Sequence, residues 1–427
     1  MDVAARDEPP GTAGAGNAPT ARRDFALLWT GQSTSLLGDQ FMVLALPLLA
    51  VTVLAASPAQ AALLPFALYV PFLAFGLPAG AIVDRLARRP IMLLCDAIQC
   101  AAFLAIAALA VIGALSFPVL VLLVAVAGCA TVFFQVAYTS YLPELFADPR
   151  DLHRGNARLY LSESVARAAG PAIAGALVRL SGVLWTVALN GLTFAVSAVA
   201  LVAIRHRESP HVPATARTRG WLARDVREGL RFVFSHDKLE PVFLCGAVYV
   251  LFLSMVEASL VLYCRNVLGL DAIGIGIVVG AAAAGYPLGN LLSGRLVDRL
   301  GIPRTLVAGA TVSVTGIVLM PVAGSAGSVV GLVAGSVVHS AGEGAFGPTS
   351  LTLRQTVTPS GLLARVNSVQ RFLIWGMIPL GSLLAALTIS IAGLSGAVWV
   401  GAIGTVLCLP TLIRRGIRTA LLPERHT

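Results

Sequence analysis

Four ionisable residues stand in otherwise apolar stretches of the sequence: Asp39, Glu257, His339 and Glu343. A carboxyl group in such surroundings can bind a proton or a cation, and an imidazole can pass a proton on. A helix would place His339 and Glu343, which are four residues apart, on one face. Two such ligands are too few for zinc, so we predict no metal site. The structural alternatives are a hydrogen-bonded Asp39 that packs beside Gly38, and a His339–Glu343 pair that locks two helices together.

An internal repeat relates two of these acids. The segment GAIVDRLARR at Gly80–Arg89 returns as GRLVDRLGIPR at Gly294–Arg304, about half the chain later. A repeat at this spacing in an apolar chain is typical of a duplicated membrane transporter. The same offset maps Asp39 to Leu253, which is one helical turn before Glu257. We therefore expect the two acids to face one central cavity from opposite halves, where they would couple protons or bind a substrate.

The composition excludes a soluble protein. Of 427 residues, 57% are hydrophobic and 12% are charged, and the mean hydropathy is +0.84, whereas soluble domains carry about 25% charged residues. The net charge of +9 lies in short basic clusters between apolar runs, which is the membrane orientation pattern and not a nucleic-acid surface. The sequence has no GxxxxGK[ST] loop and no nucleophile–base pattern. We therefore predict no cofactor, no nucleic-acid partner and no enzymatic activity.

The apolar runs predict an all-α membrane protein with twelve transmembrane helices, in two six-helix bundles related by a pseudo-twofold axis. Charge-free stretches such as 40–83 and 97–143 are about twice the length of one span, which needs about 20 residues. The expected spans are 25–55, 62–83, 91–112, 118–141, 158–179, 183–204, 241–264, 272–295, 304–323, 328–351, 366–390 and 395–413.

These spans divide the chain into five segments. They are a disordered N-terminal tail (1–20), an N-terminal bundle (21–204), a central loop with an amphipathic helix (205–238), a C-terminal bundle (239–413) and a short tail (414–427). The arginines gather in loops on one side, so both termini should be cytoplasmic in a multi-pass protein of the inner cell membrane. We expect a monomer.

The loop Gly80–Arg89 matches the pattern Gly-x-x-x-Asp-Arg-x-x-Arg-Arg, and the chain resembles the major facilitator superfamily. The resemblance covers nearly the whole sequence and implies the major facilitator fold, with two bundles that expose a central site alternately to each side. It extends to the drug-efflux and siderophore-export branch, which includes macrolide efflux and enterobactin export proteins. The segments that carry this finer resemblance are GQSTSLLGD (Gly31–Asp39), YLPELFADPRDLHRGNARL (Tyr141–Leu159), AAGPAIAGAL (Ala168–Leu177), LNGLTFAVSAVAL (Leu189–Leu201) and TPSGLLARVNSV (Thr358–Val369).

The resemblance also implies roles for residues. The loop signature is thought to act as a conformational gate, in which a glycine lets helix ends approach and the aspartate bonds to a neighbouring helix. Its residues here are Gly80, Asp84, Arg85, Arg88 and Arg89, with Gly294, Asp298 and Arg299 as a weaker mirror copy. A purely topological role is the alternative.

Two other motifs bear on direction and coupling. Gly170, Pro171 and Gly175 are similar to the antiporter motif, which tracks with export. This chain departs from the pattern at Ala87, where a second glycine is usual. It also departs in span four, where many proton-coupled antiporters carry an arginine and this chain has Gln135. We expect Gln135 to line the cavity as a neutral hydrogen-bonding group.

Three further charged residues are expected near the membrane surface. Glu163 and Arg167 should form an interfacial pair near the cytoplasmic face, and Asp96 should cap a helix or pair with loop arginines. Together the features predict a secondary transporter whose partners are a small molecule, protons and the bilayer. Proton-coupled export of drugs, siderophores or similar amphipathic compounds fits best. The alternatives are a lipid or metabolite uniporter, and a non-transporting sensor or scaffold.

Overall fold

The computed structural model describes residues 18–83, 86–146, 148–206, 208 and 221–413, and within these ranges every regular element is a helix. The elements are α1 (Ala18–Thr52), α2 (Pro58–Ala61), α3 (Leu64–Val83), α4 (Arg88–Val111), α5 (Phe117–Tyr141), η1 (Leu142–Leu145), α6 (Pro149–Ser181), α7 (Val183–Ala203), α8 (Trp221–Ser235), α9 (Leu239–Asn266), α10 (Ala272–Ser325), α11 (Val329–Val357), α12 (Ser360–Val406) and α13 (Leu409–Leu412).

Nine helices in the described part of the chain are long and apolar enough to cross a membrane. Two of them are interrupted by a glycine with a non-helical backbone, at Gly301 in α10 (φ 79°) and at Gly393 in α12 (φ 73°). Positive φ is readily adopted by glycine, so each marks a reversal of direction between two helical halves. α6 is not among the nine, although it has 33 residues, because its first half is rich in charge.

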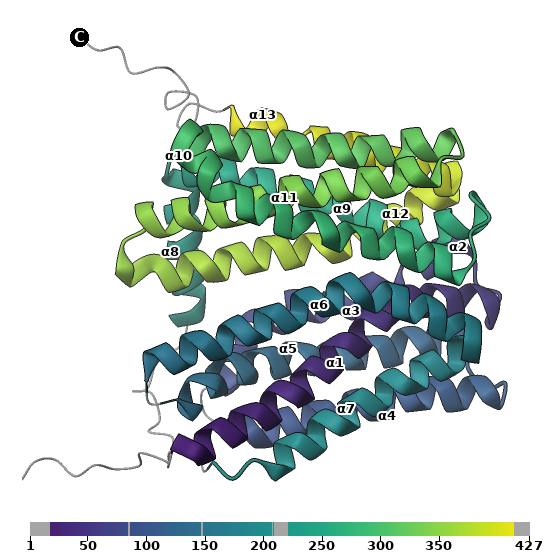
Figure 1. Cartoon of the computed structure of the whole chain (residues 1–427), viewed down its shortest axis with the longest axis horizontal. Helices are drawn as coiled ribbons and strands as arrows, with labels where there is room; N and C mark the ends of the chain where they lie inside the picture. Colours follow the sequence, from purple (N-terminus) through teal and green to yellow (C-terminus); the bar gives the residue numbers. More distant parts are fainter. Residues whose placement is uncertain (1–17, 84–85, 147, 207, 209–220, 414–427) are drawn as a thin grey trace, which may run out of the picture.

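The helices gather into two groups. Figure 1 shows α1–α7 in the lower half of the view and α9–α13 in the upper half, with α8 at the end near the chain's last described residues. Within the first group α1 packs on α6 and α7, and α4 packs on α5 and α7. Within the second, α9 packs on α12 and α10 packs on α11. Helix α1 begins inside the predicted tail of residues 1–20, and residues 1–17 and 414–427 lie outside the described ranges.

The two groups meet along two seams, α6 against α10 and α3 against α12. The α6–α10 seam is a backbone contact, since a Cβ atom at Gly175 would overlap the carbonyl oxygen of Ala272. Further along, a Cβ atom at Gly280 would lie 3.0 Å from the carbonyl oxygen of Ala168. Small residues permit such close approach between helices in a membrane.

The helix ends define two ends of the molecule. We call the end that carries the basic loops, with α8 and the start of α1, the basic end, and the other the far end. The α6–α10 contacts run from the far end inward, and the α3–α12 seam includes Gly376 packed on Leu73. By contrast, a Cβ atom at Gly80 or Gly294 would have no neighbour within 4 Å. The groups are therefore joined at the far end and apart at the basic end.

Candidate functional site

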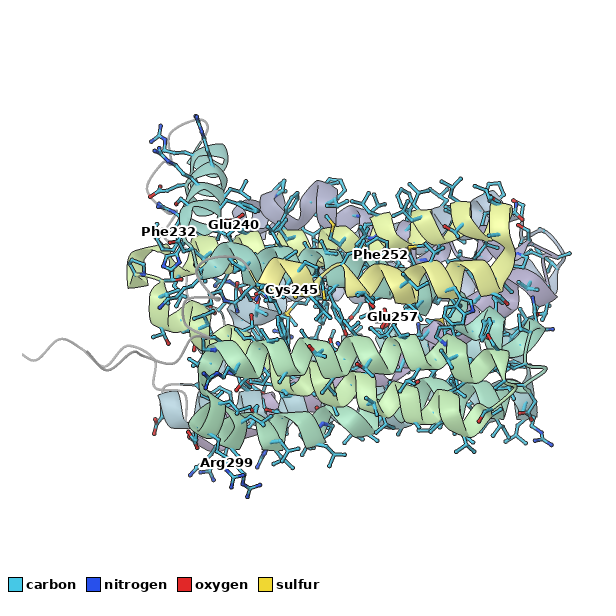
Figure 2. All side chains as sticks on the ribbon, turned by 90° about the horizontal axis from the view of Figure 1, so that it is seen from above. Phe232, Glu240, Cys245, Phe252, Glu257 and Arg299 are labelled. Carbon is cyan, nitrogen blue, oxygen red and sulfur yellow. The ribbon has the colours of Figure 1, made fainter. Side chains whose placement is uncertain are left out.

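Charged side chains from both groups face one another at mid-helix. Glu257 of α9 is exposed, and its charge interacts with those of Glu343 on α11 and Arg167 on α6. Figure 2 shows Glu257 midway along α9, on the side turned toward the neighbouring helices, whereas Glu240 lies at the basic end. Glu343 has a side-chain exposure of 44% and Arg167 of 64%. Because these three side chains are exposed, the space beside them, between the two groups of helices, is open to solvent.

Arg167 lies farther from the basic end of the molecule than the sequence predicted. Its guanidinium donates to Glu163 Oε1 from Nη2 (2.9 Å) and from Nε (3.2 Å), so the expected pair is present. It does not lie near the helix end, because α6 begins at Pro149 and not near residue 158. Arg167 also interacts with the charges of Glu257 and Glu343. Sequence reasoning missed this role because it assigned the charged first half of α6 to a loop.

An aromatic wall borders this acidic cluster. Tyr69 of α3 interacts electrostatically with Glu257, Arg167 and Asp39. Its ring lies 5.9 Å from that of Trp375 on α12, and Phe72 stacks on Trp375 at 4.8 Å. Aromatic faces attract cations and bury apolar surface. The wall and the acids together suit a compound with an apolar body and a positive charge.

A hydrogen-bonded triad of Tyr249, Ser313 and His339 lies next to the cluster and contacts it through Glu343. The Tyr249 hydroxyl lies 2.7 Å from Ser313 Oγ and 3.0 Å from His339 Nδ1, and Ser313 Oγ is also 3.0 Å from Nδ1. His339 is buried, and its Nε2 lies 3.9 Å from Glu343 Oε2. The one-face geometry predicted for His339 and Glu343 is confirmed. Two hydroxyls at Nδ1 fix the orientation of the imidazole toward Glu343.

Asp39 and Asp96 belong to the first group of helices, and Tyr69 links Asp39 to the acidic cluster. Asp39 of α1 is half-buried, and its charge interacts with Tyr69 and with Asp96 of α4. Asp96 is 1% exposed, and its carboxyl group lies beside the hydroxyl of Ser197 on α7. Of the loop arginines that the structure describes, neither pairs with Asp96: Arg88 bonds to Glu144 and Arg89 donates to backbone carbonyls of α7. Those two arginines are engaged elsewhere.

Gln135 is exposed on α5, and among the described residues no hydrogen bond joins its side chain to the acids. Thr139 donates to its backbone carbonyl at 2.9 Å, which is an ordinary intrahelical contact. Its predicted place in the cavity stays a prediction.

The basic end carries the loop signature. Asp84 and Arg85 lie outside the described residues. The amides of Arg88 and Arg89 donate to Glu208 at 2.7 and 2.6 Å, so a residue beyond α7 occupies the helix N-terminus and stabilises it through the helix dipole. Arg89 Nε and Nη2 donate to Leu201 and Val202 carbonyl oxygens at 2.9 and 2.8 Å.

The glycines of the signature show no close helix approach in this conformation, because the two groups are apart at this end. Gly80 and Gly294 have open space where a Cβ would lie. In the mirror copy, Asp298 and Arg299 are exposed, and Arg299 projects from the outer surface at the basic end (Figure 2). The roles of these residues as gates stay predictions.

The antiporter-like motif lies in the α6–α10 seam. A Cβ atom at Gly170 would overlap Gln40 of α1, and one at Gly276 would overlap the Pro171 carbonyl. With Gly175 on Ala272, the motif packs α6 closely on the Gln40 side chain of α1 and on the backbone of α10. It therefore forms part of the closed end and does not contact the acids.

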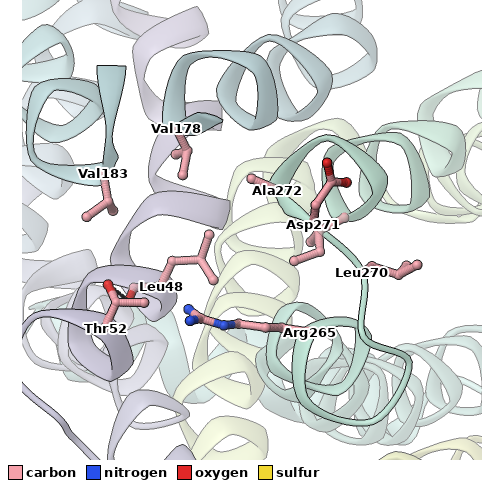
Figure 3. Close-up of a pocket in the computed structure, with 9 residues that line it drawn as sticks. Leu48, Thr52, Val178, Val183, Arg265, Leu270, Asp271 and Ala272 are labelled. Carbon is pink, nitrogen blue, oxygen red and sulfur yellow. Dashed lines mark hydrogen bonds between the residues drawn. The ribbon is translucent and has the colours of Figure 1, made fainter. Parts of the chain in front are cut away.

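The far end is closed around a small cavity. Arg179 Nη1 lies 3.2 Å from Asp271 Oδ2, across the two groups. Asp271 Oδ1 also accepts from the Gly274 amide at 2.8 Å and so caps α10. The cavity beside them, of about 340 Å³, has Arg265 directed toward Thr52 of α1 (Figure 3). It is separate from the acidic cluster.

Comparison with known proteins decides the family. A family model described as "Transmembrane secretion effector" matches residues 14–421, almost the whole chain. The chain belongs to this family of major facilitator transporters. Family membership agrees with the prediction that it is not an enzyme.

Individual relatives are more distant. The multidrug efflux pump Tap of Mycobacterium tuberculosis is 30% identical over 205 residues, which are 46% of this chain and 48% of Tap. The match thus spans about half the length of that relative. A crystal structure of a bacterial homologue of the iron transporter ferroportin in inward-facing state has a TM-score of 0.76 at 17% identity, covering 92% of this chain and 98% of the other. The nucleoside transporter NupG (D323A mutant) has a TM-score of 0.74 at 12% identity, covering 91% and 99%. These two likenesses show the fold.

Proposed function

We propose that this transporter is a proton-coupled exporter of amphipathic small molecules, drugs or siderophores among them. The observation that carries the proposal is the meeting of Glu257 and Glu343 with Arg167 across solvent-accessible space. Three acids, counting Glu163, share one arginine in this cluster. An incoming cationic substrate and a proton would compete for the surplus negative charge, and such competition is the basis of exchange. The name of Tap, a multidrug efflux pump, supports the substrate class.

The topology proposed here has twelve spans. α10 crosses twice about Gly301, α12 crosses twice about Gly393, and α6 crosses once in addition to the nine apolar candidates. Segments 21–204 and 239–413 then form the two bundles, and 205–238 connects them. The basic loops place the basic end in the cytoplasm.

With that orientation, the open basic end corresponds to an inward-facing conformation. A substrate would enter from the cytoplasm or the inner leaflet and reach the acids and the aromatic wall. Rocking of the bundles would then close the basic end and part the α6–α10 seam. The loop signature at Gly80 and Gly294 would form its close helix contact in that second conformation.

His339 would act as the proton carrier behind Glu343. Its Nδ1 is held by the two hydroxyls of Tyr249 and Ser313, so Nε2 is the nitrogen turned to Glu343. A proton that leaves Glu343 on substrate binding would pass through Nε2 of His339 to the cytoplasmic side, and after extrusion Glu343 would take up another proton from the outer side.

Everted vesicles test the proposal. A pH-sensitive dye should report proton release from energised vesicles on addition of a transported compound, found first by a growth screen against toxic compounds in a host without its own efflux pumps. Glu257→Gln should abolish this release, whereas Asp237→Asn, at the exposed α8–α9 junction, should leave it intact. Transport without proton movement would indicate a uniporter, and ligand binding without transport would indicate a sensor. Either result contradicts the proposal.

A further inference from the structure

Helix α8 differs from the long helices in its direction and in its attachment to one group. Figures 1 and 2 both show it running across the long helices at the basic end, and in Figure 2 it projects past their edge near Phe232. Its main contacts are with α12 and α9 of the second group. A helix that lies perpendicular to the spans at one end of a membrane bundle runs along the membrane surface.

One face of α8 is docked near the start of α12. A Cβ atom at Gly229 would lie 3.0 Å from Val369 Cγ2 and 3.1 Å from the carbonyl oxygen of Arg365. Val233 is fully buried in an apolar cluster that includes Val369. Next to this face, Glu228 Oε2 lies 2.7 Å from Arg365 Nη1. The docking therefore holds α8 against the side of α12 and pairs the charge of Glu228.

The opposite face of α8 is basic. Arg224, Arg227 and Arg231 are spaced by three and four residues, so they share one face of the helix. Arg231 is about 200° around the helix from both Gly229 and Val233. The three arginine side chains are exposed, and among the described residues none of them makes a hydrogen bond or an ion pair. They therefore point away from the bundle.

The acids of α8 do not neutralise this face. Glu228 belongs to the ion pair with Arg365. Asp225 is the other acid in the sequence of α8 and stands against three arginines, which leaves a surplus of two positive charges. Phe234, three residues after Arg231, is 41% exposed. A helix face with arginines and an exposed aromatic ring is typical of binding to an anionic membrane surface.

We propose that α8 binds anionic phospholipid headgroups of the surrounding leaflet through Arg224, Arg227 and Arg231. One arginine near an anionic surface adds about a fivefold preference for it, and α8 presents three on one face. Because α8 is docked on α12, the lipid contact is connected to the helix that carries Trp375. The inference goes beyond the proposed function: it names a partner of α8 and holds for either direction of transport.

Hydrogen exchange of the full-length protein in lipid nanodiscs tests this surface. The probes are discs of phosphatidylcholine alone and discs of an equimolar mixture with phosphatidylglycerol. Anionic lipid should hold α8 in its helical form, so we expect its amides to exchange about 5- to 100-fold more slowly with phosphatidylglycerol. The slowing should shrink at high salt, because salt screens exposed charges.

Matched variants locate the effect. Replacing the three arginines of the basic face together by glutamine should remove the slowing, and α8 should persist because glutamine is a good helix former. The control is the combination Arg22→Gln, Arg23→Gln and Arg158→Gln, which removes three exposed arginines from the first group. This control should keep the slowing in α8.

Equal exchange of wild-type α8 in the two kinds of disc, or slowing that survives in the α8 variant, overturns the proposal. Inorganic phosphate added to phosphatidylcholine discs forms a further arm: slowing by phosphate alone would indicate a site for soluble anions and not a lipid surface. If α8 exchanges too fast to follow, native mass spectrometry can count the phosphatidylglycerol molecules retained per protein. The α8 variant should retain fewer than the control, and equal retention overturns the proposal. A protein that shows the slowing but exports nothing would keep the lipid surface and refute the exporter.

Discussion

The α6–α10 seam allows a sharp test of rocking. In Gly175→Ala the new methyl would overlap the Ala272 carbonyl oxygen and lie 3.0 Å from its carbon and 3.1 Å from Ile273 Cα. Backbone atoms cannot rotate away as a side chain does, so the closed far end should lose about 1–3 kcal/mol, the usual cost of overpacking. The strain disappears when the seam parts. The equilibrium should therefore shift about 5- to 150-fold toward the conformation with an open far end.

Spin labels at Ala114 and Ala326, exposed far-end residues of the two groups, can measure this shift by electron–electron resonance in a variant without the native cysteines. Gly175→Ala should move the distance distribution to longer values. Gly246→Ala is the control, since its methyl meets nothing within 4 Å and it changes only the helix propensity in both conformations. An unchanged distribution in a folded Gly175→Ala protein would refute the rocking seam.

Three further outcomes are expected. Tyr249→Phe removes the hydroxyl that reaches Ser313 and His339 and should destabilise the protein by about 1–3 kcal/mol. The measurement is the denaturation midpoint, which should fall. An unchanged midpoint would show that the triad is not formed. Glu208→Ala removes the acceptor of the first α4 amides and should lower the stability of the protein by about 1 kcal/mol. Hydrogen exchange should become faster at the Arg88 amide and stay equal in the rest of α4. Exchange at Arg88 that stays slow would contradict the cap. Gly301→Ala forces alanine into φ 79°, ψ 163° and should lower the stability of the protein by about 1–3 kcal/mol. The melting temperature should fall accordingly. A variant as stable as wild type would mean that the chain reverses direction elsewhere.

The apolar pattern predicted most of the helices because lipid exposure leaves a strong signal in sequence. Ends such as those of α4, α5 and α7 agree closely with the predicted spans. The pattern failed for α6, whose first half is rich in charged residues. The helix therefore starts earlier than predicted, and Arg167 lies deep enough to meet acids of the other bundle.

The polar interior was less predictable than the spans. Asp96 was assigned to the surface by its nearness in sequence to Arg88, but eight residues of helix rise by about 12 Å, which carries it into the bundle. The Tyr249–Ser313–His339 triad joins three helices, and neutral residues so distant in sequence leave no local signal. Its one clue was an imidazole in an apolar run. Tertiary packing decides which side chains come together, and a single sequence does not show this.

The α6–α10 seam has a consequence for how the specificity of such a transporter can change. Its contacts are main-chain atoms at glycine and alanine, and they do not involve Tyr69, Trp375 or the acids. The aromatic wall lies in the α3–α12 seam, so a substitution there can alter which solutes are accepted and leave the α6–α10 backbone contacts untouched. Recognition of solutes and the α6–α10 contact can therefore change independently, whereas recognition and the α3–α12 contact share residues.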